Sequence, residues 1–72
     1  MSDIIYQRAG KIASAIYLIT SFFSDQEPLK WRLRTLSTNL VSEEIKDKSI
    51  TAKEIFYLFS VAKTVSLDSE VN

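Results

Sequence analysis

Three cations and a tryptophan lie within five consecutive residues, as Lys30, Trp31, Arg32 and Arg34. Lysine and arginine neutralise phosphates and tryptophan stacks on bases, so this stretch could bind nucleic acid. On a helix of about 100° per residue, however, Lys30 lies near Arg34 while Arg32 points elsewhere. A phosphate-binding surface needs several cations on one face, so Lys30 and Arg34 are only weak nucleic-acid candidates.

Acidic side chains gather at Glu43, Glu44 and Asp47. Glu43 and Asp47 could share a cation on a helix, but two carboxylates without further ligands bind a metal weakly. The sequence contains no histidine and no cysteine, which removes the usual general base, the commonest metal ligand and any thiolate. We therefore expect no enzyme activity, no catalytic or metal site and no cofactor.

The elements that must position these side chains are helices. The first is expected over about residues 3–23 and the second over about 26–48, with Asp25 as N-cap and Pro28 in the first turn. Apolar residues recur every three or four positions in both, as one stripe per helix. The stripes are Ile5, Ala9, Ile12, Ile16, Ile19 and Phe23, then Leu29, Leu33, Leu36 and Leu40.

Further apolar residues widen the first stripe on both sides, which predicts that the first helix is buried on more than one side. The short connection predicts that the first two helices pack antiparallel. Ile12, Ile16 and Ile19 should then face Leu33, Leu36 and Leu40.

A third helix is expected over about residues 52–65, followed by a tail over 66–72. Thr51 and Glu54 have the spacing of a capping box, and Ile50 and Ile55 that of a hydrophobic staple. The chain of 72 residues is thus expected to be one all-α domain, an antiparallel hairpin plus a third helix. A three-helix bundle, or a four-helix bundle truncated in a fragment of a longer protein, would fit.

A second apolar strip lies on the second helix, opposite its leucines. Its members, with Arg34 at the edge, form the candidate partner interface: Trp31, Arg34, Thr38, Val41 and Ile45. Packing inside the intact domain is the simpler interpretation of this strip. The alternative is an exposed patch that binds a second copy or another helical protein segment.

The run "ITAKEIFYLFSVAKTVS" resembles the helix-turn-helix of bacterial repressors at Thr51, Glu54, Ile55, Val61, Thr64 and Val65. That motif has alanine and glycine where this chain has Phe56 and Ser60. Without the glycine that permits the turn, one continuous helix through Val65 is expected.

The segments "IYLITSFFSDQEPLKWRLRTLS" and "AKEIFYLFSVAKTVSLDSEVN" together resemble the N-terminal helical region of small uncharacterised bacterial proteins. Longer members place a helix-turn-helix domain after this region. The resemblance implies a dimerisation or regulatory module of a transcription regulator.

The apolar run over residues 12–23 follows Arg8 and Lys11, as in a signal peptide. It carries several hydroxyl side chains, no small-residue cleavage site follows, and it is too short to span a bilayer. We therefore expect a cytoplasmic protein without a membrane partner. Its expected function is that of a non-catalytic interaction or dimerisation module; the alternative is a fragment of a DNA-binding transcription regulator.

Overall fold

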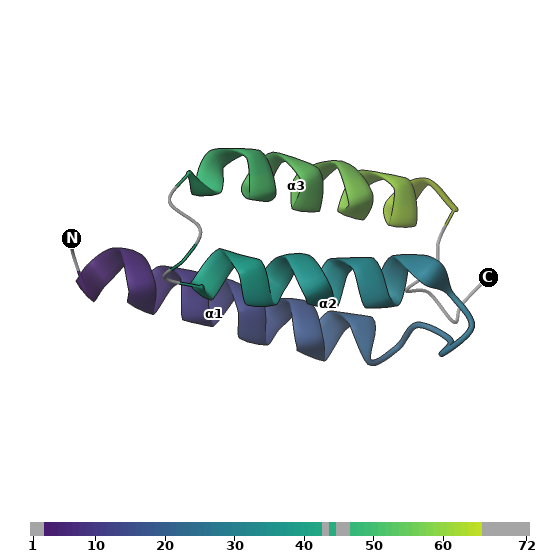
Figure 1. Cartoon of the computed structure of the whole chain (residues 1–72). Coiled ribbons are helices and arrows are strands. Elements are labelled where there is room, and N and C mark those ends of the chain that lie inside the picture. Colours follow the sequence, from purple (N-terminus) through teal and green to yellow (C-terminus); the bar gives the residue numbers. More distant parts are fainter. Residues whose placement is uncertain (1–2, 43, 45–46, 66–72) are drawn as a thin grey trace.

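The computed structural model describes residues 3–42, 44 and 47–65, with side chains from residue 7 onward. It contains three helices, α1 (Asp3–Thr20), α2 (Pro28–Val41) and α3 (Lys48–Val65). Consecutive helices run in opposite directions (Figure 1). The predicted all-α fold, a helical hairpin with a third helix packed on it, is confirmed.

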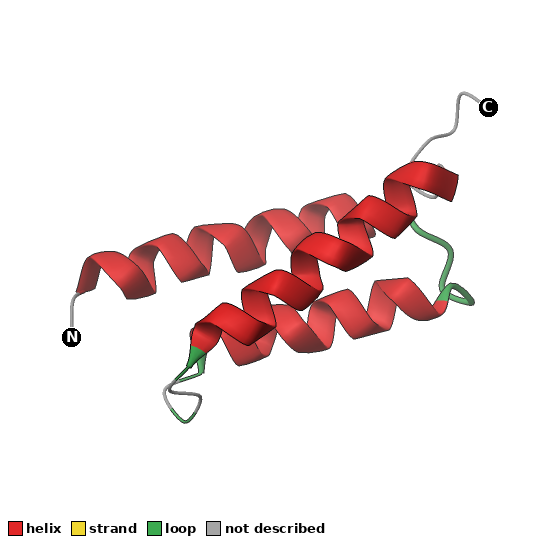
Figure 2. Ribbon diagram, turned by 90° about the horizontal axis from the view of Figure 1, so that it is seen from above, coloured by secondary structure: helices red, strands yellow, loops and turns green. Residues whose placement is uncertain are grey.

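The central helix is α2, because α1 and α3 both pack against it. Within the described helices, no Cα atom of α1 comes within 8 Å of a Cα atom of α3. Figure 2 shows α3 passing at an angle over the other two helices. Directly packed helices have axes only about 8–10 Å apart, so α1 and α3 stand further from each other than either stands from α2, and we call the side between them the open side.

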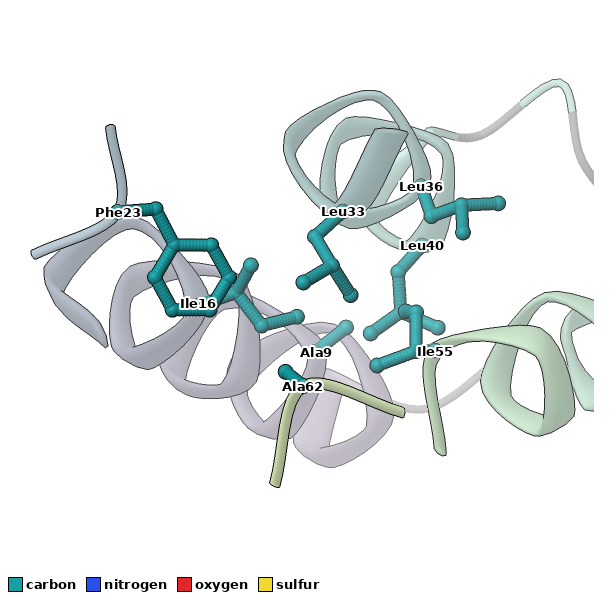
Figure 3. Packing of buried hydrophobic residues seen from close by; sticks show 8 residues of the cluster. All are labelled: Ala9, Ile16, Phe23, Leu33, Leu36, Leu40, Ile55 and Ala62. Atoms are coloured by element: carbon teal, nitrogen blue, oxygen red, sulfur yellow. The ribbon is translucent and has the colours of Figure 1, made fainter. Parts of the chain in front are cut away.

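The core lies where all three helices face one another, and Leu33 is fully buried at its centre (Figure 3). Burying each such side chain contributes roughly 1.5–3 kcal/mol. The stripe on α2 therefore lies in the core largely as expected. The buried apolar residues are Ala9, Ile16, Phe23, Leu33, Leu36, Leu40, Ile55 and Ala62.

The stripe expected on α1 is only partly buried. Ile16 is 2% exposed, but Ile12 is 48% and Ile19 is 38% exposed, while Thr20 is fully buried in their place. The prediction that α1 is buried on more than one side is therefore wrong. The physical reason for this exposure is the position of α3, which covers α2 and leaves one flank of α1 open.

The first helix ends at Thr20 rather than near Phe23. The Thr20 hydroxyl donates a hydrogen bond of 2.7 Å to the carbonyl of Ile16, a contact that competes with regular helix bonding. Beyond it, the Phe23 amide donates to the Thr20 carbonyl in a tighter turn. This turn brings Phe23 under the core, where it is buried.

The second helix begins after Glu27, not after Asp25 as predicted. The carboxylate of Glu27 accepts a hydrogen bond of 3.0 Å from the amide of Leu29, and Pro28 needs no partner because it has no N–H. The helix ends at Val41 instead of reaching residue 48.

The two described members of the acidic cluster consequently do not lie on a helix. Glu44 and Asp47 lie between α2 and α3, and Glu43 falls outside the described residues. Asp47 provides the cap of α3: its carboxylate accepts hydrogen bonds of 3.0 Å from the Ser49 amide and 2.7 Å from the Ser49 hydroxyl. These two bonds lower the pKa of Asp47, and the bond from the hydroxyl has the larger effect.

The third helix thus begins at Lys48, earlier than predicted, and the predicted capping box is wrong. Thr51 lies inside the helix and is buried, Glu54 bonds to α2, and Ile50 is exposed rather than stapled to Ile55. Asp47 offers a side-chain acceptor one turn before Thr51, which explains the earlier start.

The same helix continues without interruption through Ser60 to Val65, as predicted from the missing glycine. The turn of a helix-turn-helix therefore does not form within α3. The tail expected over residues 66–72 lies outside the described residues.

Candidate functional site

The first cation of the basic stretch, Lys30, is held inside the fold. The residue is only 7% exposed, and its ammonium group lies 2.5 Å from the carboxylate of Asp25 and 3.4 Å from the carbonyl of Phe23. The hydrogen bond from Lys30, and then its charge, lower the pKa of Asp25. Lys30 is therefore not available as an outward phosphate contact.

The second cation, Arg32, connects α2 to α3. Its guanidinium donates two hydrogen bonds, of 2.8 and 3.0 Å, to the two carboxylate oxygens of Glu54. This paired geometry lowers the pKa of Glu54 and raises that of Arg32, mainly through the hydrogen bonds. Glu54, predicted to cap its own helix, instead joins two helices.

The third cation, Arg34, closes one flank of α1. Its Nε donates to the Thr20 hydroxyl at 2.8 Å and its Nη2 donates to the Tyr17 carbonyl at 3.0 Å. Its guanidinium carbon lies 4.6 Å from the ring centre of Tyr17 and 5.6 Å from that of Trp31. A positive charge beside the last carbonyls of α1 also opposes the negative end of the helix dipole.

These contacts create a surface pocket of about 250 Å³, lined by Tyr17, Trp31, Arg34, Thr35 and Thr38. The structure thus brings together three residues of the predicted interface, Trp31, Arg34 and Thr38. Sequence reasoning missed that Tyr17 completes the pocket. Only the pairing of α1 with α2 places it there.

The other members of the predicted strip do not extend the pocket. Val41 is exposed near the end of α2 but does not line it, and Ile45 lies outside the described residues. Trp31 is 49% exposed, while its indole N–H donates to the Asp25 carbonyl at 2.8 Å. The described part of the strip is therefore not buried by α3, and α1 contacts it only through Tyr17 and Thr20 beside Arg34.

A second surface, which the sequence did not reveal, lies on α1 and α3. Ile12, Leu18 and Ile19 are exposed on α1, and Phe56 and Tyr57 are exposed on α3. A hollow of about 420 Å³ opens on the surface of α3 among Ala52, Lys53, Phe56 and Tyr57. The periodicity of α1 predicted that these isoleucines are buried, so nothing in the sequence indicated that they could contact a partner.

Across the described ranges, no cluster of three or more histidine, cysteine or carboxylate side chains could hold a metal ion. The described helices also include none that is both long and apolar enough to cross a membrane. Comparison with protein-family models, curated proteins and solved structures finds no match to this chain. Function must therefore be inferred from the two surfaces themselves.

Proposed function

We propose that this chain is a non-catalytic protein-interaction module, which binds a helical segment of another protein or of a second copy. The observation that carries the proposal is the balance between buried and exposed apolar side chains. Among the described residues, twelve large apolar residues are exposed, whereas the buried core has eight apolar residues, two of them alanines. So much exposed apolar surface favours association.

The small size of the chain supports the same function. A domain near this size buries only about 60% of its unfolded surface, and its stability is correspondingly small. A partner that binds the folded chain but not the unfolded chain stabilises the folded state. Helices are suitable partners, since an apolar stripe on one helix packs into the groove of another.

The alternative, a fragment of a DNA-binding regulator, gains no support from the basic stretch. Lys30, Arg32 and Arg34 bond to three different groups of acceptors within the chain. The alternative predicts binding to duplex DNA that weakens steeply with salt, which makes it separable from the apolar association proposed here.

Sedimentation velocity from micromolar to millimolar concentration, with and without amphipathic helical peptides, tests the proposal. We expect association either of the chain with itself or with a peptide, and we expect it to persist at high salt because apolar contacts are not screened. A chain that stays monomeric at every concentration and binds none of the peptides would contradict the proposal.

A further inference from the structure

The orientation of α1 shows which of its residues face the open side. Tyr17 lies beside Arg34 of α2, so that flank faces α2, although Tyr17 itself remains 42% exposed. At about 100° per residue, Ile12 and Ile19 lie roughly 140–160° around the helix from Tyr17. They therefore lie on the opposite flank, on the side where α3 stands away from α1, which agrees with their partial exposure.

The orientation of α3 follows in the same way. Glu54 bonds to Arg32 and marks the flank of α3 at the outer edge of α2. Ala52 and Phe56 lie roughly 160° around the helix from Glu54, on the flank toward α1. We call Ile12 and Ile19 of α1, together with Ala52, Phe56 and the half-buried Phe59 of α3, the open face.

The open face adjoins a concave feature that could receive a side chain. Ala52 and Phe56 also line the hollow of about 420 Å³ on α3, with Lys53 and Tyr57 at its far side. Phe56 is 73% exposed there. Apolar anchors that enter such hollows provide most of the binding energy in many helix interfaces.

The described charged side chains of α1 and α3, apart from Glu54, all have one sign. Arg8 and Lys11 on α1, and Lys53 and Lys63 on α3, are exposed, and none forms an ion pair within the described part of the chain. The carboxylates whose side chains the structure describes lie in the two loops or against Arg32. They are Asp25 and Glu27, then Glu44 and Asp47, and Glu54.

We propose that the open face binds an amphipathic helix of another protein whose apolar stripe is flanked by glutamate or aspartate. This inference rests on the proposed interaction function and names the chemistry of the partner. An acidic flank would meet unpaired cations on both α1 and α3, while the stripe covers the isoleucines and Phe56. A second copy that docks through the same face would instead set the four cations against one another.

Nucleic acid fits this face less well than a helix does. Phosphates would use the cations, and bases would stack on Phe56 or Tyr57. The exposed aliphatic side chains of Ile12, Leu18 and Ile19 offer nothing to phosphates or stacked bases, whereas leucines of a partner helix would bury them.

Two synthetic helical peptides with identical leucine stripes test the charge preference, one with glutamate and one with lysine at the flanking positions. Calorimetry of the full chain with each peptide should show at least about tenfold tighter binding of the glutamate peptide at low salt. The ratio should shrink as salt is added. Amide chemical shifts should change at Ile12, Ile19 and Phe56.

Exposed variants make the test specific to this face. Lys53→Glu combined with Lys63→Glu should reverse the preference between the peptides. Phe56→Ala should weaken the binding of both peptides by tenfold or more. Val61→Ala is the matched control, because Val61 lies two turns after Glu54 on the other flank and is itself exposed. It should leave binding unchanged, and thermal melts should show that each variant still folds.

Equal affinity for the two peptides would overturn the acidic-flank inference and leave the interaction function standing. Self-association that Phe56→Ala abolishes would also overturn the acidic-flank inference, because a second copy of the chain would then occupy the open face. Tighter binding of duplex DNA or poly(U) than of the glutamate peptide would also overturn it. Binding of neither peptide by a chain that stays monomeric would defeat the interaction function as well.

Discussion

The two flanks of α1 both carry apolar side chains, yet their surroundings differ. On one flank, Arg34 of α2 bonds to the carbonyl of Tyr17 and the hydroxyl of Thr20, so this flank faces α2, and Thr20 is buried while Tyr17 stays 42% exposed. On the other, Ile12 and Ile19 border a side that α3 does not cover. The comparison teaches that the position of the neighbouring helix, more than apolar character, decides which residues form the core.

The largest effect expected from this comparison concerns Ile16 and Ile19. Ile16→Ala should cost about 2–5 kcal/mol because it leaves a cavity in the core, and that is much of the stability of so small a domain. Ile19→Ala, on the open flank, should cost about 1 kcal/mol or less. Urea unfolding at low protein concentration measures both. Equal losses would show that Ile19 on the open flank is buried as fully as Ile16 in the core.

A smaller effect tests the polar contact on the closed flank. Thr20→Val keeps the shape of the side chain but removes the hydroxyl that accepts from Arg34, and an unsatisfied, partly buried donor costs about 1–3 kcal/mol. Thr38→Val is the control, since the exposed Thr38 hydroxyl bonds only to the Thr35 carbonyl of its own helix. If both variants unfold at the same urea concentration, Arg34 does not close this flank.

The sequence predicted the helices better than their partners. Spacing at the helical period was sufficient for three helices, and Leu33, Leu36 and Leu40 of α2 are buried as expected because this helix has a neighbour on either side. Helix ends were predicted less well. Asp47 and Glu27 took the capping roles assigned to Thr51 and Asp25, and several nearby residues could cap equally well in sequence alone.

The candidate sites were harder still. Trp31, Arg34 and Thr38 could be placed together because they lie on one helix, where periodicity fixes their directions. Tyr17 could not, since its place beside Arg34 depends on how α1 packs on α2. The exposure of Ile12 and Ile19 likewise depends on where α3 lies, which no local pattern records.

The smallest effect expected distinguishes the two junctions of α2 by their response to acid. Arg34 joins α2 to α1 through a carbonyl and a hydroxyl, neither of which titrates in the acid range, whereas Arg32 joins α2 to α3 through the carboxylate of Glu54. The folded-state pKa of Glu54 lies below its ordinary value of 4.5. Its contribution to stability is therefore full above that value and is lost as the pH falls through the lowered pKa.

Acid should accordingly weaken the contact of α3 with α2 through Glu54, but not the contact that Arg34 makes with α1; the loop between α1 and α2 has its own titrating pair, Asp25 with Lys30. The effect is small because the ion pair is exposed to solvent. Hydrogen exchange followed residue by residue below pH 5 should show protection falling in α3, and Glu54→Gln should remove the part of that pH dependence that does not come from the Asp47 cap, whose pKa is also lowered. The same pH dependence in α3 with and without Glu54 would mean that the contact between α2 and α3 does not depend on Glu54, and that the two junctions differ in geometry alone.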